Sequence, residues 1–292
     1  MKFIAFVKGE GNAKGYNMSE TSIITGVYNI ENCQSFHKSM QSILQQSYSD
    51  FEWILCDDGS TDGTWELLQK YAAKDKRIRL LRNEKNMGLA ATLNYCLGYV
   101  EGEFVARQDA DDYSMKNRLE KQIDYLKKHP EIAVLGCQLF LFDERGIWGK
   151  SIFPRQVTNR DFLFNSPYRH GAVVFRKEAL QQAGGYRVAK ETRRAEDYDL
   201  FMTIQTFGKG ENLDEYLYCF CEDLHAKRRR KYRYRLDEVK IRFLGFRKLG
   251  LLPKGILYVV KPLLVGLIPR LLLEKIKDKY YDRRVDKEYT SL

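Results

Sequence analysis

Hydrophobic and polar positions in the first half of the chain repeat with two alternating periods. Short apolar runs, typical of buried strands, cover residues 22–28, 51–56, 78–81 and 103–108. After each run, apolar residues recur every three or four positions, which is the spacing of one helix face. These residues are Phe36, Met40, Ile43 and Leu44; Trp65, Leu68 and Tyr71; Leu89, Leu93, Cys96 and Leu97; and Leu119, Ile123 and Leu126. The alternation predicts an α/β fold with a Rossmann-like, mostly parallel sheet flanked by helices, in which ligands bind at the carboxyl ends of the strands.

The pattern is less regular in the second half. Apolar runs predict strands at 132–142 and 172–175, and residues 196–207 form a helical pattern with an acidic first turn. Residues 251–273 are strongly apolar, but three prolines interrupt them and are expected to break a spanning helix into short pieces. These are Pro253, Pro262 and Pro269. Short amphipathic segments of this kind suit the surface of a membrane.

We therefore divide the chain into three parts. Residues 1–20 form an N-terminal leader, and residues 21–224 form one unit with two halves, at about 21–130 and about 131–224. Residues 225–292 form a basic, amphipathic helical tail.

Charge is concentrated in that tail. Residues 225–292 carry 20 Lys and Arg against 7 Asp and Glu, whereas residues 1–224 carry 29 against 32. A basic tail indicates an anionic partner, either nucleic acid or an anionic membrane. The rest of the chain is net negative and contains no recognisable nucleic-acid-binding module, so we expect a membrane surface and no nucleic acid. The alternative is that the tail helices simply pack on the unit formed by residues 21–224.

The six cysteines form no Cys-x-x-Cys pair, and no secretory signal is visible. Reduced thiols suit the cytosol. We expect a cytoplasmic protein that lies peripherally on the cytoplasmic face of the membrane.

Two acidic turns directly follow predicted strands. Asp109, Asp111 and Asp112 follow the run 103–108, where crowded carboxylates repel one another unless a divalent cation with oxygen ligands binds them. The alternative is a solvated turn or helix caps. The turn Asp57–Gly63 follows the run 51–56 and could contact a base or ribose, or simply cap the next helix.

A third acidic group, Glu196 and Asp197, opens the predicted helix 196–207. Acidic residues are stabilised at a helix N-terminus by the dipole alone. The functional alternative is a general base for an acceptor hydroxyl.

These motifs, taken in order, resemble the family 2 glycosyltransferases of the GT-A fold over roughly residues 21–220. The series is Tyr28-Asn29, Asp57-Asp58-Gly59-Ser60-Thr61-Asp62, Asn86-Met87-Gly88, Asp109-Ala110-Asp111-Asp112 and Glu196-Asp197. The resemblance implies an inverting transfer from a nucleotide sugar, with UDP as the expected nucleotide. It makes residues 21–224 the catalytic domain, with the donor-binding half at about 21–130 and the acceptor half at about 131–224.

The resemblance also implies roles for individual residues. Asp57 would hydrogen-bond the uracil with Tyr28 packed nearby, and Asn29, Asp58, Asn86 and Asp109 would complete the nucleotide-sugar site. Asp109 and Asp111 correspond to the DXD pair, with Asp112 assisting, that holds Mn²⁺ or Mg²⁺ on the diphosphate. Asp197 would be the catalytic base, with Glu196 beside it. His170 is a candidate for the acceptor site, or else holds a structural position. His225 is a candidate for a diphosphate or metal contact, or else lies on the surface.

Two features refine this interpretation. The Gln-x-x-Arg-Trp motif of processive synthases is absent, so we expect transfer of a single sugar to a saccharide or lipid-linked acceptor, as in cell-surface polysaccharide assembly. Residues 26–29 read Gly-Val-Tyr-Asn where the family usually begins with proline. The alternatives are a nucleotidyltransferase that makes a nucleotide sugar, which lacks its usual glycine-rich loop here, and a non-enzymatic nucleic-acid-binding protein that uses the tail.

Overall fold

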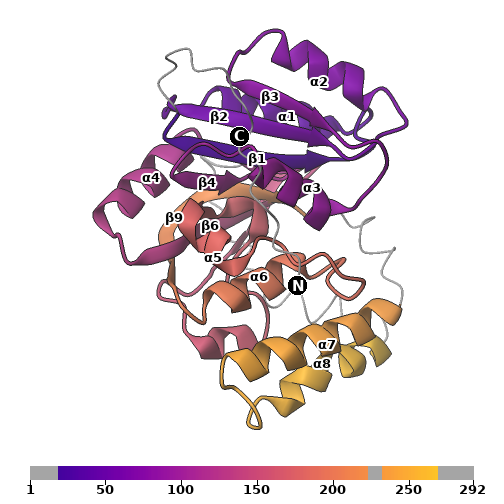
Figure 1. Cartoon of the computed structure of the whole chain (residues 1–292), viewed down its shortest axis with the longest axis vertical. Helices are drawn as coiled ribbons and strands as arrows, with labels where there is room; N and C mark the ends of the chain where they lie inside the picture. The colour runs from indigo at the N-terminus through magenta and orange to yellow at the C-terminus, as the bar shows by residue number, and fades with distance from the viewer. Residues whose placement is uncertain (1–18, 223–231, 269–292) are drawn as a thin grey trace.

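The computed structural model describes residues 19–222 and 232–268 (Figure 1). One mixed sheet lies at its centre, in the strand order β3-β2-β1-β4-β8-β6-β9-β5, with β7 paired to β6. The strands are β1 (Thr21–Val27), β2 (Phe51–Asp57), β3 (Ile78–Arg82), β4 (Phe104–Arg107), β5 (Tyr113–Ser114), β6 (Ile132–Asp143), β7 (Gly146–Ser151), β8 (Val174–Arg176) and β9 (Lys209–Cys221).

Helices cover both faces of the sheet. They are α1 (Gln34–Leu44), α2 (Thr64–Ala72), α3 (Leu89–Leu97), α4 (Arg118–Lys128), α5 (Lys177–Ala183), α6 (Glu196–Ile204), α7 (Arg233–Lys248) and α8 (Ile256–Leu267). Successive residues of a strand point to opposite faces, so Ile23 packs with α1, α2 and α4, while Ile24 packs with α3, α5 and α6. The expected α/β layers are therefore present.

The prediction of a mostly parallel sheet is wrong for the second half of the chain. Strands β3, β2, β1 and β4 pair in parallel, but β8 runs antiparallel to both β4 and β6. The physical reason is the route of the chain, since the short turn η2 (His170–Ala172) enters β8 at the edge where β4 ends. Strand β8 must then run back along β4.

The prediction that prolines interrupt the apolar tail needs a similar correction. Pro253 precedes α8, and the helix ends before Pro269 with Ile268 extended, as a residue before proline usually is. Pro262, however, lies buried inside α8, and the helix continues through it. Proline removes one backbone hydrogen bond, and here its ring is packed into the protein.

Candidate active site

Three parallel strands place the predicted acidic turns at one edge of the sheet. Val27 at the end of β1 is in register with Asp57 at the end of β2, and β4 pairs with the other side of β1. Carboxyl ends of neighbouring parallel strands lie together, so Tyr28, Asp57 and Asp109 follow adjacent strands at the same edge.

Asp57 is fully buried and held by two partners. Its Oδ1 accepts a hydrogen bond of 2.9 Å from the backbone amide of Ser60, and its Oδ2 lies 3.1 Å from Nε of Arg82. The Arg82 guanidinium in turn lies over the ring of Trp65, 5.0 Å from its centroid. This carboxylate is therefore fixed and charge-compensated before any ligand binds.

Asp58 connects the first acidic turn to the loop before α3. Its carboxylate accepts hydrogen bonds from Nδ2 of Asn83 at 2.8 Å, from the Met87 amide at 2.8 Å and from the Gly88 amide at 2.9 Å. Gly59 has φ +69°, and a Cβ there would lie 2.5 Å from the Lys85 backbone, so the approach requires glycine. Asp58 thus orders the loop that exposes Asn86; a direct contact of either residue with the donor stays a prediction.

Tyr28 and Asn29 lie beside this turn. The Asn29 amide donates to Oγ of Ser60 at 2.9 Å, and its Oδ1 accepts from the Thr61 amide at 3.0 Å. Asn29 adopts φ 50°, a left-handed conformation that asparagine tolerates better than most residues. The neighbouring residue Tyr28 is 45% exposed at this edge, so a base could pack against its ring.

Asp109 is anchored by a fully buried arginine. Nη2 of Arg107 donates to its Oδ1 at 2.6 Å, and Nη1 of Arg107 donates to the Ile24 carbonyl at 3.1 Å. The Asp109 amide donates to the Tyr218 hydroxyl at 3.2 Å. Gly171 approaches so closely that a Cβ there would lie 2.7 Å from Oδ2 of Asp109. The second acidic turn is therefore in contact with β9 and η2.

Asp112 provides the test of whether this turn suits a cation. Its Oδ1 accepts from the Cys221 amide at 2.7 Å, whereas its Oδ2 is buried and has no hydrogen-bond partner within the described ranges. Burial, followed by the charges of Asp111 and Asp109, raises its pKa well above the usual range. A buried, unpaired carboxylate oxygen beside two further carboxylates fits a divalent cation.

These carboxylates do not form a complete metal site by themselves. No group of three or more His, Cys, Asp or Glu side chains in residues 19–222 and 232–268 is arranged to hold a metal ion. A cation here would need further ligands from elsewhere, such as the oxygens of a bound diphosphate.

The first turn of α6 meets the same site. Glu196 is buried, and burial together with the charge of Asp197 raises its pKa to about 8. Burial also raises the pKa of Asp197, and the charge of Asp109 acts in the same direction on both carboxyls. Two acidic motifs that are far apart in the sequence are thus close enough to influence each other's ionisation.

His170 is buried behind these acids. Its Nε2 lies 2.8 Å from the Tyr186 hydroxyl, and burial followed by the charge of Arg107 lowers its pKa to about 3. His170 is therefore neutral at ordinary pH, and its role towards an acceptor stays a prediction. His225 lies outside the described residues.

The sequence interpretation missed two arginines of the site, Arg107 and Arg169. Arg169 lies over the Phe220 ring at 3.8 Å, and its Nε is buried without a hydrogen-bond partner in the described part of the chain. Burial raises the pKa of Asp112 and of Asp197, and the positive charge of Arg169 opposes both rises. The sequence signal for Arg107 was its position within an otherwise apolar strand, where a charged residue needs a buried partner.

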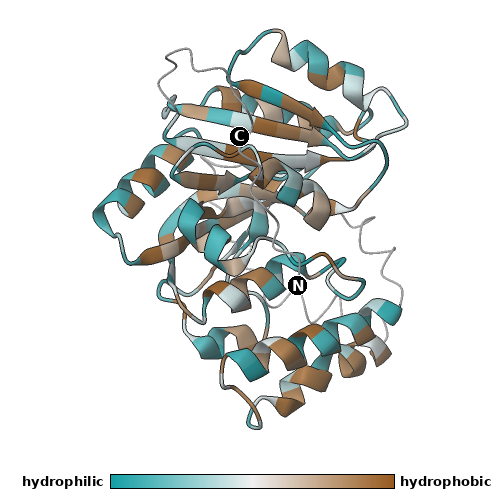
Figure 2. Cartoon of the chain, viewed as in Figure 1, coloured by the Kyte–Doolittle hydropathy of each residue, from teal (hydrophilic) through white to brown (hydrophobic). Residues whose placement is uncertain are grey.

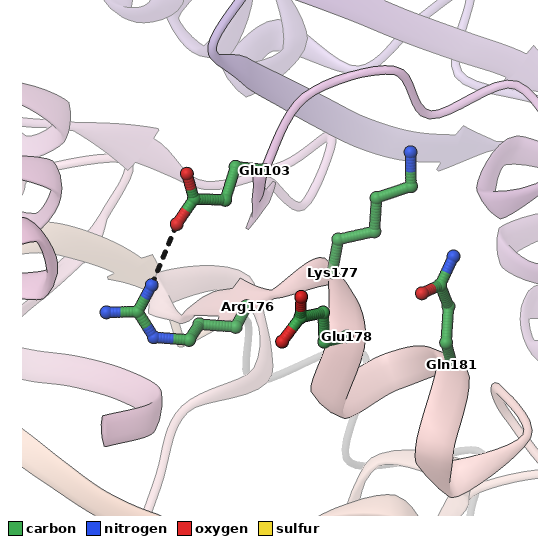
Figure 3. Close-up of a pocket in the computed structure, with 5 residues that line it drawn as sticks. All are labelled: Glu103, Arg176, Lys177, Glu178 and Gln181. Atoms are coloured by element: carbon green, nitrogen blue, oxygen red, sulfur yellow. Dashed lines mark hydrogen bonds and ion pairs between the residues drawn. The ribbon is translucent and has the colours of Figure 1, made fainter. Parts of the chain in front are cut away.

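A separate cavity of about 330 Å³ lies away from these residues (Figure 3). It is lined by Glu103, Arg176, Lys177, Glu178 and Gln181, and Glu103 and Arg176 form an ion pair of 2.9 Å. Glu103 precedes β4, whereas Asp109 follows it, so this cavity lies at the opposite edge of the sheet. It contains none of the predicted site residues.

Comparison with known proteins gives consistent matches. Residues 22–184, which contain both acidic turns, match the family model described as Glycosyl transferase family 2. The chain is 39% identical over 268 residues to the "Putative glycosyltransferase EpsE" of Bacillus subtilis, covering 91% of this chain and 94% of that protein. It is 33% identical over 183 residues to the UDP-Glc:alpha-D-GlcNAc-diphosphoundecaprenol beta-1,3-glucosyltransferase WfgD of Escherichia coli, covering 63% of this chain and 68% of that protein.

Among solved structures, S. aureus TarS 1-349 in complex with UDP-GlcNAc has a TM-score of 0.63 to this chain at 24% identity. The match covers 77% of this chain and 66% of that one. At this identity the likeness supports the fold alone.

Proposed function

Since this chain belongs to glycosyl transferase family 2 and is a glycosyltransferase, we propose that it transfers one sugar from a UDP-sugar to a hydroxyl of a lipid-linked saccharide, with inversion at the anomeric carbon. The observation that carries this proposal is that Asp109, at the carboxyl end of β4, lies close enough to Glu196 and Asp197 for its charge to raise the pKa of both. Membership of this family excludes the alternative that the protein is a nucleotidyltransferase.

The donor would bind along the edge formed by β2, β1 and β4. Asp57, held by Arg82 and the Ser60 amide, would accept the uracil N–H through Oδ2, which has no hydrogen bond within the described residues. The turn would have to open for this contact because Asp57 is fully buried, whereas the exposed Tyr28 ring is available to pack against the base. The UDP-sugar in the name of WfgD supports a uridine nucleotide.

The diphosphate would lie over the second acidic turn. Asp111 and the unpaired Oδ2 of Asp112 would hold a divalent cation, with Asp109 fixed beside them by Arg107. When bound, Mn²⁺ or Mg²⁺ supplies positive charge that stabilises the departing diphosphate. Arg169 contributes a fixed positive charge to the same region.

Asp197 would act as the base. Because burial raises the pKa of this carboxyl, it is a stronger proton acceptor than an exposed aspartate. It would take the proton from the acceptor hydroxyl as the oxygen forms a bond to the anomeric carbon. The bond from that carbon to the diphosphate breaks on the opposite face, which inverts the configuration and releases UDP.

The test is UDP release from a panel of UDP-, GDP- and dTDP-sugars with a lipid-linked acceptor extract, in Mn²⁺ and in EDTA. We expect release from a UDP-sugar only when the metal is present. Asp111→Ala should reduce the rate by at least about a hundredfold, and Asp124→Ala, which removes an exposed carboxylate on α4, should not.

Two results would contradict the proposal in different ways. Equal release in EDTA and Mn²⁺ would reject the metal assignment and leave the transferase reaction standing. Release from GDP- or dTDP-sugars, with none from a UDP-sugar, would reject the proposed donor.

A further inference from the structure

Helices α7 and α8 form a hairpin that is fixed to the catalytic domain at the end of the molecule opposite α2 (Figure 1). Arg242 on α7 is buried, and its guanidinium donates to the carbonyls of Leu163 at 3.0 Å and Phe164 at 3.1 Å. Gly245 lies against Met202 of α6, so closely that a Cβ there would be 2.2 Å from the methionine sulfur. The hairpin therefore has a defined orientation relative to α6, the helix that carries Glu196 and Asp197.

Most residues of α8 are hydrophobic (Figure 2). Five exposed aliphatic residues recur at helical spacing, and they lie within an arc of about 100°. They are Ile256, Leu257, Val260, Leu264 and Leu267. Leu257, Leu264 and Leu267 are 74%, 60% and 71% exposed, although an arc of this width and composition is what a helix normally buries.

The inner side of α8 is already occupied. Val259 and Pro262 are buried, and Nζ of Lys261 donates to the Phe164 carbonyl at 2.7 Å. Among the described residues, therefore, the exposed aliphatic face of α8 is the part of this helix that a partner could contact. Aliphatic side chains exposed in such a row are typical of an interaction site.

We propose that this face of α8 lies on an anionic lipid surface, parallel to it. Residues 239–268 contain no Asp or Glu, and four of their cations are exposed: Lys240, Arg247, Lys248 and Lys254. Exposed cations complement anionic headgroups around an apolar contact. The helix has 12 residues, and at about 1.5 Å per residue it is far shorter than the roughly 30 Å hydrocarbon core. No helix within the two described ranges is long and apolar enough to cross a bilayer.

The same charge pattern goes against a second copy of the chain as the partner. A symmetric contact through α8 would bring two sets of cations together with no acidic residue from this stretch to compensate.

The role of this lipid contact in catalysis rests on the proposed function. A hairpin fixed to α6 would hold the acceptor-side acids at a constant distance from the membrane that carries a lipid-linked acceptor.

The experiment measures binding of the full chain to vesicles. Phosphatidylcholine vesicles, with and without about 30% phosphatidylglycerol, are floated with wild-type protein at low and high salt. We expect binding to the anionic vesicles that weakens with salt. The double variant Leu257→Asp/Leu264→Asp should bind at least about tenfold more weakly, and Ile152→Asp, at a residue that is 67% exposed but lies after β7, should bind like the wild type.

Three results would overturn the proposal. The first is equal vesicle binding by the double variant and the wild type, or no binding by the wild type. The second is a wild-type dimer in lipid-free buffer that the double variant converts to monomer, since α8 would then contact a second copy. The third is a marked fall in the Tm of the double variant but not of Ile152→Asp, since another part of this chain would then cover α8.

Metal-dependent UDP release in lipid-free buffer is measured on each variant separately, so failure of the proposed function is distinguishable from failure of lipid binding.

Discussion

The two acidic turns at the edge of the sheet differ in how their carboxylates are satisfied. In the first turn, Asp57 is paired with Arg82, although its buried Oδ2 has no hydrogen bond within the described residues, and Asp58 accepts three hydrogen bonds. In the second, Oδ2 of Asp112 is buried without a partner in the described structure, and burial raises its pKa. Oε2 of Glu196 across the site is in the same condition.

This difference indicates that the first turn is a scaffold for the donor and that the second turn takes part in the reaction. Hydrogen bonds and an opposite charge both stabilise a buried carboxylate, so Asp58 is satisfied by its hydrogen bonds and Asp57 is compensated by Arg82. A buried carboxylate without a partner destabilises the fold and is retained where a ligand or a reacting group supplies the missing charge. The second turn and the start of α6 are therefore where chemistry is expected, whereas the first turn positions the donor.

The largest effect should come from Asp197→Asn, which tests the reactive side of the comparison. We expect the rate of sugar transfer to fall by about 10³-fold, because an amide cannot take the acceptor proton. UDP affinity and Tm should change little. Asp124→Asn on the exposed face of α4 is the control, and an Asp197→Asn enzyme that retains a tenth or more of the wild-type rate would exclude this residue as the base.

The next prediction compares the two turns directly by stability. Asp58→Asn should lower the free energy of unfolding by about 2–4 kcal/mol, because an amide nitrogen would face a backbone N–H of Met87 or Gly88. Asp112→Asn in metal-free protein should be neutral or stabilising, because it removes an uncompensated buried charge. Urea unfolding at neutral pH in EDTA measures both. Equal destabilisation by the two variants would remove the distinction between the turns.

The sequence predicted the helices and strands of residues 21–128 better than the second half of the sheet. Every strand and helix expected between residues 21 and 128 is present, because β1 to α4 have clean apolar periods. Strand β9 was missed because its pairing with β6 shifts register: Leu213 pairs with Cys137, and Tyr216 pairs with the next residue, Gln138. The extra residues, Asp214 and Glu215, interrupt the alternation that marks a strand.

The sequence predicted which acidic residues belong to the site, but it did not predict their hydrogen-bond partners. The acidic residues are recognisable one by one, yet nothing local in the sequence joins Asp112 to the Cys221 amide or Asp109 to Tyr218. These contacts depend on β9 returning beside β6. For the same reason the sequence does not distinguish the satisfied Asp58 from the unsatisfied Asp112, since both are aspartates that follow a strand.

A smaller effect should appear in the pH dependence of stability. Burial and the charge of Asp197 raise the pKa of Glu196 from 4.5 to about 8, so the folded protein keeps a proton that the unfolded chain has already lost. Stability contributed by that proton is present below about pH 4.5 and is lost as the pH rises towards 8. Glu196→Gln should remove this loss.

We therefore expect Glu196→Gln, in EDTA, to be more stable than wild type at about pH 9 by about 2–5 kcal/mol, the upper value being the full shift, which gives a Tm difference on the order of 10 °C. The difference should vanish near about pH 4. Thermal unfolding across this range measures it. A Tm difference that stays constant with pH would mean that the substitution acts through packing and not through ionisation.

The smallest effect should come from Tyr28→Ala, on the scaffold side of the comparison. Tyr28 is 45% exposed and stands beside the fixed Asn29, so removing its ring should leave the Tm unchanged. UDP affinity should fall by about fivefold, near 1 kcal/mol, because one face of the uracil would lose its stacking partner. Tyr95→Ala, which removes a ring of similar exposure on α3, is the matched control. Calorimetric titration with UDP and with UMP should give the same fold-change for both nucleotides if Tyr28 contacts the base. A loss confined to UDP would place Tyr28 at the diphosphate and would join the two turns into one site.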